Sequence, residues 1–403
     1  MMGKTPNKWL MFAVVYFCAV TVSFAQLKIP PVMGFVAEGL NISMSQAGWL
    51  MSLFTLAGII LAIPGGMVMA KVGAKKLLIL QMACLIIGNF LGAAAGSYVL
   101  MLIARAIEGF GFAMIILTSI YIINACFQGS KTGGTAMGLL NTFAPLGSFV
   151  TMNAGLPVAR TLGYQGLWII VGILAIVCLL LVIFVLKVPE IETLADTTAG
   201  AAARPSLAEA AQNGRIWLLA FTMGILAFMA FVPLTTYPLW FQGFYGVEPQ
   251  TANFYSSLNG LAGIPLCILI GILVDKTQRP VLILLIGMVM MLVCAFTFDI
   301  LTGPATYAGH ALLSSLASGL GMTTVFYLAP RLSKQPQNIG YSISIVNQIY
   351  FIGVFLSTPV ILSIIESSGF SAAKWFMVVI TIVAVVLAAL QKAMSGKAPV
   401  PLK

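Results

Sequence analysis

Five ionisable side chains lie within otherwise apolar stretches of this chain: Lys28, Arg105, Glu108, Asp299 and His310. A charge in the core of a bilayer costs about 2.5–3.5 kcal/mol on insertion scales, so a membrane-embedded ionisable residue is a functional candidate by default. The two strong bases could hold an anion, whereas Glu108 and the imidazole could exchange a proton. This combination predicts a site at which an anion binds together with a proton.

Lys28 lies near the end of the first apolar stretch, in the sequence Gln26-Leu-Lys28-Ile-Pro30-Pro31. We expect its ammonium to point into a central cavity and attract an anion. The alternative is that its four-carbon stem lets the ammonium snorkel to the outer lipid headgroups. Lysine offers a point charge with three donors, whereas arginine offers a planar fork suited to a carboxylate, so the geometry of the substrate stays open.

Arg105 and Glu108 stand three residues apart, on one face of a helix, near enough to pair and to lower the cost of burying both. They could form a purely structural pair. If instead a substrate competes for Arg105, Glu108 loses its partner and its proton affinity rises, which links substrate binding to proton uptake. We favour this second mechanism.

His310 is the only histidine and titrates near neutral pH unless its surroundings shift it. It could carry the coupled proton or bind the anion, although a lone histidine in an apolar helix more often serves packing. Asp299, near a span end, is expected to be solvated. Neutral polar groups within spans could complete a substrate site, namely Gln26, Asn141, Asn153, Tyr237, Tyr255, Asn259, Asn347 and Gln348.

Composition identifies the elements that must position these groups. Hydrophobic residues make up 60% of the 403 residues and charged residues only 7%, far from the shares of a soluble domain. A helix that spans the bilayer core needs about 20 apolar residues. The apolar blocks divide at glycines, prolines and charges into twelve such spans: 9–31, 47–68, 77–95, 98–125, 135–158, 167–186, 216–237, 253–274, 281–301, 305–328, 341–364 and 373–390.

The first span is longer than the apolar core of a signal peptide and lacks a cleavage site, so we expect it to be retained. Both termini then lie on one side of the membrane. Nearly all lysines and arginines outside the spans fall on that side, and only Arg160 and Lys374 fall in outer loops. The positive-inside rule makes that side cytoplasmic, in a plasma membrane such as the bacterial inner membrane. The net charge of +10 suits anionic lipid headgroups rather than a nucleic acid.

A repeated phrase divides the chain into two halves. Gly66-Met-Val-Met-Ala70-Lys71-Val-Gly73 begins at the end of the second span, and Gly271-Ile-Leu-Val-Asp275-Lys276-Thr-Gln-Arg279 begins at the end of the eighth. We predict one bundle over residues 1–187, a cytoplasmic linker over 188–214 and a second bundle over 215–403. In the linker, Ser206-Leu-Ala-Glu209 fits a capping box, which predicts a short surface helix.

Twelve spans in two halves, a long central inner loop and the repeated loop phrase resemble the major facilitator superfamily, over essentially the whole chain. The resemblance implies an all-α membrane protein of twelve transmembrane helices in two pseudo-symmetric six-helix bundles. It also implies secondary transport by alternating access. The family's loop signature is thought to lock the inner side. In the second half it is matched by Gly271, Asp275, Lys276 and Arg279, with Gln278 in place of its second glycine, and in the first half by Gly66, Lys71, Gly73, Lys75 and Lys76. Ala70 stands where the signature has an acid, so any charge relay there should be weaker.

The fourth span carries Arg105-Ala-Ile-Glu108-Gly109-Phe-Gly111, which is similar to a second family motif. The resemblance implies a link between that arginine and proton coupling, although helix packing is the main role expected for the two glycines. In organic-anion carriers of the family, a basic residue in the first helix often binds the substrate carboxylate, which implies that role for Lys28. The repeat offset pairs Asn141 with Asn347, Gly147 with Gly353 and Arg105 with His310.

The sequence has no phosphate-binding loop, dinucleotide fingerprint or nucleophile constellation, so we expect neither an enzyme nor a cofactor. The six cysteines are scattered, and we expect neither disulfides nor a metal site. We predict a monomeric transporter for a small organic anion, of the monocarboxylate type, coupled to protons or another ion. The Met-rich and Phe-rich interior keeps open a proton-coupled antiporter for drug or metabolite efflux. A channel, or a sensor that keeps the carrier fold, is the third possibility.

Overall fold

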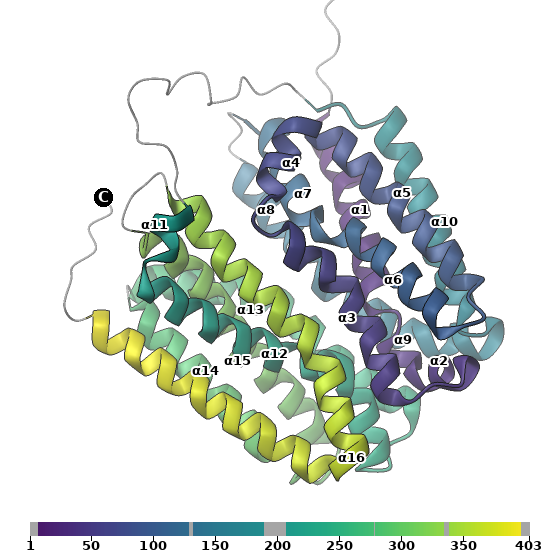
Figure 1. Cartoon of the computed structure of the whole chain (residues 1–403), viewed down its shortest axis with the longest axis vertical. Helices are drawn as coiled ribbons and strands as arrows, with labels where there is room; N and C mark the ends of the chain where they lie inside the picture. Colours follow the sequence, from purple (N-terminus) through teal and green to yellow (C-terminus); the bar gives the residue numbers. More distant parts are fainter. Residues whose placement is uncertain (1–6, 129–131, 189–206, 278, 334–337, 396–403) are drawn as a thin grey trace, which may run out of the picture. The chain divides into compact units, whose positions relative to one another are not determined.

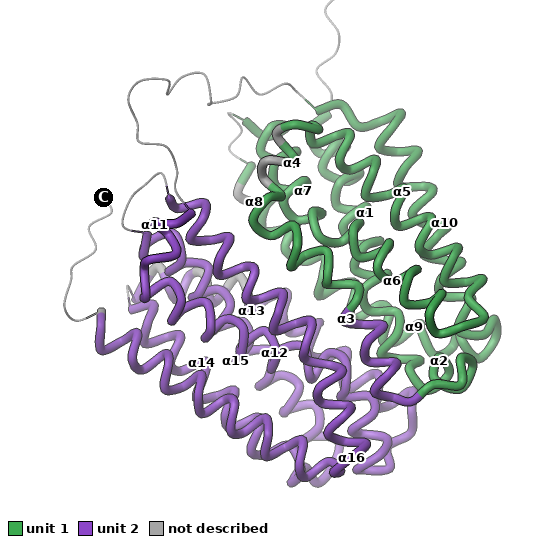
Figure 2. Tube along the Cα trace, viewed as in Figure 1, with its two compact units in different colours: residues 1–42, 53–202 green, residues 43–52, 203–403 purple. Residues whose placement is uncertain are grey.

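The computed structural model describes residues 7–128, 132–188, 207–277, 279–333 and 338–395. The structure describes only the backbone of a few residues inside helices, among them Gly66, Ala70, Gly271 and Asp275. Every regular element in the described ranges is a helix. The chain forms two compact units, one of residues 1–42 and 53–202, the other of residues 43–52 and 203–403 (Figure 2).

The N-terminal elements run in the following order (Figure 1). They are α1 (Lys8–Leu27), the 3-10 helix η1 (Pro30–Val32), α2 (Met33–Leu40), α3 (Met44–Leu61), α4 (Gly65–Val72), α5 (Ala74–Ala93), α6 (Tyr98–Ala113), α7 (Ile115–Cys126), α8 (Gly133–Leu140), α9 (Phe143–Leu162) and α10 (Gln165–Phe184). The C-terminal elements are α11 (Leu207–Ala211), α12 (Gly214–Gly243), α13 (Pro249–Thr277), α14 (Pro280–Thr297), α15 (Pro304–Arg331) and α16 (Ile339–Ser395).

Nine helical segments in the described residues are long and apolar enough to cross a membrane. Helix α16 counts once among them, although Gly369, at φ 80°, breaks it into two helices. Helices α9 and α13 cover the fifth and eighth predicted spans. Each of the twelve predicted spans therefore has a helix, and the all-α membrane fold class is confirmed.

The first span is longer than the sequence predicted. Helix α1 ends at Leu27, and the chain continues through η1, where Pro30 and Pro31 lack the N–H groups an α-helix needs, into α2. The apolar segment thus runs from Lys8 to Leu40 rather than ending at Pro31. Lys28 consequently lies at a break within this helical segment instead of near its end.

Glycines bring neighbouring helices within each unit close together. A Cβ on Gly147 of α9 would collide with the Ser23 side chain of α1, and one on Gly353 of α16 would collide with the backbone of Gly224 in α12. Lipid tails are as apolar as the helix side chains, so the hydrophobic effect does little to hold helices together in a membrane. Close packing therefore supplies much of the free energy of helix association. The two glycines that the repeat offset pairs thus occupy similar contacts in their own units.

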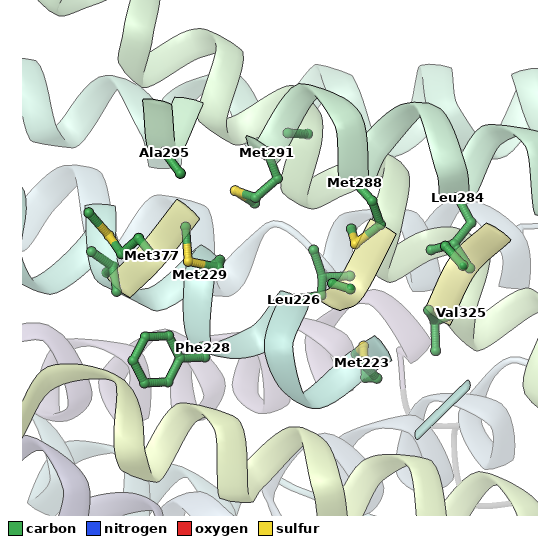
Figure 3. Close-up of a cluster of buried hydrophobic side chains, with 14 of the residues drawn as sticks. Met223, Leu226, Phe228, Met229, Leu284, Met288, Met291, Ala295, Val325 and Met377 are labelled. Atoms are coloured by element: carbon green, nitrogen blue, oxygen red, sulfur yellow. The ribbon is translucent and has the colours of Figure 1, made fainter. Parts of the chain in front are cut away.

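The core of the second unit is rich in methionine (Figure 3). Met223 and Met229 of α12 lie among buried side chains from α14, α15 and α16, together with Met288, Met291 and Met377. All five are at most 3% exposed, so these flexible side chains fill the space between helices.

At the start of this unit, α11 is held by two hydrogen bonds. Trp217 Nε1 donates to the Ala211 carbonyl at 2.7 Å, and Asn338 donates to Glu209 at 2.8 Å. The short helix predicted in the linker is therefore present. Ser206, its predicted cap, lies outside the described residues.

Candidate functional site

Lys28, at the break after α1, is completely buried in the first unit. Its Nζ donates to Glu108 Oε1 at 2.9 Å and to Asn89 Oδ1 at 2.5 Å. The carboxylate comes from α6 and the amide from α5, where Asn89 Nδ2 also donates to the Leu85 carbonyl at 2.7 Å. Three helical segments therefore converge on one ammonium group.

Arg105 and Glu108 form the pair that their spacing predicted. Arg105 Nη1 lies 2.5 Å from Glu108 Oε2, and both side chains are fully buried. The same Nη1 donates to the Ala25 carbonyl at 2.8 Å. This carbonyl belongs to the last turn of α1, where no following helical N–H is available, so the guanidinium satisfies a helix-end acceptor. Glu108 thus gives one oxygen to each cation.

Two aromatic rings cover the cations. Lys28 Nζ lies 4.2 Å from the ring centroid of Trp168 in α10, and the Arg105 guanidinium lies 4.3 Å from that of Phe54 in α3. The quadrupole of an aromatic face attracts a cation, and more strongly where water is excluded. The rings therefore offset part of the desolvation cost that burial of these charges carries.

Glycines make room for this cluster. A Cβ on Gly88 would collide with Glu108, and one on Gly92 would collide with the indole of Trp168. On α6, a Cβ on Gly109 would collide with the backbone of Phe54, and one on Gly111 would lie 2.9 Å from the Gln81 carbonyl oxygen. The packing role predicted for Gly109 and Gly111 is confirmed.

With Lys28 and Arg105 protonated and Glu108 ionised, the cluster carries one excess positive charge. Lys28 and Arg105 each contribute a cation, whereas Glu108 contributes the single carboxylate. Among the described residues of the first unit the only other acid is Glu38, and it is exposed. A buried excess charge is costly unless a counterion or a change of protonation compensates it, so the cluster can attract an anion or release a proton.

The alternative in which Lys28 snorkels to the outer headgroups is wrong. Its side chain is completely buried, and its ammonium is bound inside the protein. Asn89 and Trp168, which surround it, were not predicted. They belong to no recognisable motif and lie far from Lys28 in the sequence, so no local signal could have found them.

His310 lies in the second unit, on α15, and is 5% exposed. Its Nε2 is 3.0 Å from the Cys294 carbonyl oxygen and its Nδ1 is 2.7 Å from the Tyr237 hydroxyl. A carbonyl only accepts, so Nε2 carries the proton, and in the neutral ring Nδ1 accepts from the hydroxyl. The rings of Tyr237 and Phe298 pack against the imidazole. These contacts favour the packing role over the two functional ones.

Asp299, which was expected to be solvated, has a side chain that is 24% exposed, but it is also ion-paired. Its two carboxylate oxygens accept from Lys374 Nζ at 2.7 and 2.9 Å. The Lys374 side chain is 9% exposed and lies near the rings of Phe296 and Trp375, at 5.0 and 5.2 Å from their centroids. This lysine belongs to α16 rather than to an outer loop. The pair joins segments 75 residues apart, a tertiary contact that the sequence does not reveal.

The other predicted site residues have varied surroundings. Gln26 is buried in α1, and Asn141 is exposed at the end of α8. Asn347 and Gln348 are half-buried on α16.

In the loop phrases, Lys71, Lys276 and Arg279 are exposed, and Gly73 has a φ of 84°, which favours glycine. Lys75, beside them, donates to the Leu186 carbonyl at 2.7 Å and to that of Ile183 at 3.2 Å, at the end of α10. The structure describes neither the surroundings of Gly66 and Gly271 nor the side chain of Asp275.

The chain is similar to a family of known transporters. The family model of the Major Facilitator Superfamily matches residues 12–358. The "Probable sulfoacetate transporter" of Cupriavidus necator is 23% identical over 67% of this chain and 64% of its own length. The 3-(3-hydroxyphenyl)propionate transporter of Escherichia coli is 24% identical over 74% of this chain and 72% of its own. The "Probable sugar efflux transporter" of Mannheimia succiniciproducens is 26% identical over 46% and 48%. The match thus covers less than two thirds of the first and third of these relatives.

Solved structures share the fold. A bacterial homologue of the human lysosomal transporter Spinster, in an inward-facing and occupied conformation, has a TM-score of 0.75 at 16% identity and covers 98% of both chains. A point mutant of the nucleoside transporter NupG has a TM-score of 0.77 at 14% identity, over 96% of this chain and 100% of that one.

Proposed function

Because the chain belongs to the Major Facilitator Superfamily, we propose that it carries a small organic anion together with a proton across the membrane. The carrier is proposed to work by alternating access of its two halves, residues 1–187 and 215–403, joined by the linker 188–214. We further propose a plasma membrane location with both termini in the cytoplasm, and a monomeric carrier.

The excess positive charge of the buried cluster is the observation that carries this proposal. Lys28 and Arg105 share the single carboxylate of Glu108. A carboxylate or sulfonate bound beside Lys28 would neutralise the cluster, which a neutral or cationic solute would not do. Two of the relatives support an organic anion, since sulfoacetate and 3-(3-hydroxyphenyl)propionate are both organic anions.

Glu108 gives the proposal its coupling step. An anion that approaches Lys28 competes with Glu108 Oε1 for the ammonium, and its own negative charge opposes the carboxylate. Both effects favour the protonated form of Glu108, so binding of the anion draws in a proton. A monoanion that travels with one proton leaves the charge of the loaded carrier equal to that of the empty one.

The remaining predicted residues have supporting roles in this proposal. Gln26, Asn141, Asn347 and Gln348 would contact the substrate, and Arg105 would assist binding or proton transfer. A part for His310 in either step is the alternative to the packing role that its contacts favour. The loop residues Gly66, Lys71, Gly73, Gly271, Asp275, Lys276 and Arg279 would hold the inner side closed between transport steps.

Thermal stability of the detergent-purified protein tests the proposal. The protein is heated with carboxylates, sulfonates, inorganic anions, sugars and lipophilic cations at two pH values. A ligand at 100 times its dissociation constant stabilises the folded state by about 2.7 kcal/mol. We expect stabilisation by a set of organic anions, larger at the lower pH. Stabilisation by sugars or lipophilic cations alone would contradict the proposal.

A proton-coupled efflux antiporter for drugs or metabolites is the second candidate. Its support is the relative named as a sugar efflux transporter and the methionine-rich interior of the second unit. Those methionines are buried among one another, which also suits a purely structural role. Export of a lipophilic cation that is lost in Glu108→Gln would favour this candidate. Ligand binding without counterflow in liposomes would instead point to a sensor.

A further inference from the structure

Trp168 occupies one side of the Lys28 ammonium. An ammonium group has three N–H donors. Glu108 Oε1 and Asn89 Oδ1 accept two of them, and the indole ring lies on a further side with its centroid 4.2 Å from Nζ. Trp168 itself is completely buried. Its contact with Lys28 therefore takes place where water does not weaken it.

The surroundings fix the indole in this position. Gly92 of α5 leaves the space that the edge of the ring fills, since a Cβ there would collide with Cδ1 and Nε1. On another side Tyr164 packs edge-on, with ring centroids 5.9 Å apart. The indole Nε1 has no hydrogen-bond partner among the described residues. A hydrogen bond thus does not explain the placement of this ring, whereas its face on the ammonium does.

The charge next to Lys28 changes during the proposed cycle. Among the described residues two charged side chains flank its ammonium, and both come from α6. Glu108 stabilises the charged form of Lys28, whereas the positive charge of Arg105 destabilises it. Asn89 from α5 and the indole from α10 are neutral. When Glu108 takes up its proton, the ammonium faces Arg105 without a carboxylate. At that stage only neutral groups and the incoming anion favour the charged form of Lys28.

We propose that Trp168 is the positioning residue that keeps Lys28 charged and in place while Glu108 is protonated. This inference rests on the proposed function, because it explains how the anion-binding form of Lys28 persists at that step. The ring face favours the ammonium over the neutral amine through its quadrupole, and it does so in either protonation state of Glu108. Trp168 thereby supports anion affinity without a polar contact to the anion.

Substitutions at Trp168 test the proposal in the purified full-length protein. Trp168→Phe keeps a weaker aromatic face, and Trp168→Leu keeps an apolar side chain without one. We expect affinity for sulfoacetate, 3-(3-hydroxyphenyl)propionate and acetate to fall in the order Trp, Phe, Leu. The loss in the leucine variant should reach about tenfold. Gly92→Ala, which displaces the ring, should fall between wild type and leucine.

Rescue separates this role from a purely structural one. The guanidinium of arginine stays charged where an ammonium can lose its proton. Lys28→Arg should therefore lose less affinity in the Trp168→Leu background than in the wild type.

Trp240→Phe is the matched control. Trp240 is equally buried, and its indole Nε1 likewise has no partner among the described residues. It packs on Phe298 and Phe370, without a nearby cation in the described contacts. Trp240→Phe should bind the anions as the wild type does.

A second readout needs no substrate. NMR of protein with isotope-labelled lysine side chains reports the protonation of Lys28 as a function of pH, and the Lys28 signal is assigned by its loss in Lys28→Arg. In Trp168→Leu, the midpoint of this titration should fall by about one unit, with Lys374 as the internal reference in the same sample. An unchanged titration of Lys28, together with wild-type affinity in Trp168→Leu, would overturn the proposal.

Two further outcomes are distinguishable. If no tested anion binds the wild type, the proposed function fails, whereas the titration of Lys28 still decides the role of Trp168. If the leucine variant does not fold, fluorinated tryptophan, which weakens the ring face without a change of shape, gives the same test.

Discussion

The ammonium of Lys28 lies 2.9 Å from Oε1 of Glu108, 80 residues further along the chain, with both side chains fully buried. The other carboxylate oxygen of Glu108 is paired with Arg105. One carboxylate thus serves two cations, and this imbalance is the physical basis of the proposed transport. An anion can complete the site by replacing Glu108 at Lys28.

Lys28→Ala should abolish anion binding and leave a folded protein. The substitution removes the excess charge and leaves the Arg105–Glu108 pair electrically balanced. Ligand-induced stabilisation should disappear, a loss of about 2.7 kcal/mol at 100 times the wild-type dissociation constant. Lys374→Ala is the control, since it removes another largely buried, ion-paired lysine. That variant should lose stability but keep anion binding. Wild-type affinity in Lys28→Ala would contradict the role of Lys28.

Glu108→Gln should separate anion binding from pH. In the wild type, proton uptake accompanies binding, so affinity should rise as the pH falls, by up to about tenfold per unit. Glutamine mimics the protonated acid, and affinity should then be high and independent of pH. Two buried cations without their carboxylate should also cost about 3–5 kcal/mol of stability, part of which the anion restores. Calorimetric titration at several pH values gives the comparison. In the control, Glu38→Gln, the exposed acid of α2 is removed and the pH dependence should stay.

The sequence predicted those parts of the site that depend on local spacing. Arg105 and Glu108 were readable as a pair because three residues bring side chains together on one helix. The partners of Lys28 were not readable, because Asn89, Glu108 and Trp168 reach it from separate helices. The end of the first apolar segment was also misplaced. Two prolines look like the end of a span, whereas here they produce a short 3-10 turn from which the chain continues to Leu40.

Tertiary packing also decides the surroundings of the ionisable residues in the second unit. Asp299 and Lys374 each looked like a residue near the membrane surface, and only tertiary packing of α16 on the end of α14 joins them. From the sequence, His310 could be judged only by the pKa of a free histidine. Its hydrogen bonds to the Tyr237 hydroxyl and the Cys294 carbonyl come from tertiary packing and could not be predicted. The twelve spans, in contrast, follow from composition alone, because an apolar stretch of that length has one stable form in a membrane.

Asn89→Asp should weaken anion binding through charge. The aspartate places a second carboxylate against Lys28, balances the excess charge and should reduce affinity by at least about tenfold. Asn89→Ala removes the hydrogen bond instead and leaves the charge balance unchanged. It should cost about 1–3 kcal/mol of stability, because a buried donor loses its acceptor, but it should retain the anion. Equal losses of affinity in both variants would show that the hydrogen bond, not the charge, matters.

His310→Phe should destabilise the protein without a change in the pH dependence of transport. It removes both hydrogen bonds of the imidazole and should cost about 1–3 kcal/mol. Tyr237→Phe removes one of them from the other side, so the two substitutions together should cost less than their sum. Thermal unfolding of both single variants and the double variant measures this coupling. A transport rate that no longer responds to pH in His310→Phe would instead assign the coupled proton to the histidine.

We propose that anion and proton move together through the Lys28–Glu108 pair. Proton movement into proteoliposomes tests this coupling. It is followed with a trapped pH dye while a gradient of a monocarboxylate that stabilises the purified protein is imposed without a membrane potential. We expect acidification of the lumen that depends on the protein, fails in Lys28→Ala and is insensitive to an imposed potential. The carboxylate should still exchange in Glu108→Gln, without proton movement. Carboxylate uptake by the wild type with no movement of protons would contradict the coupling.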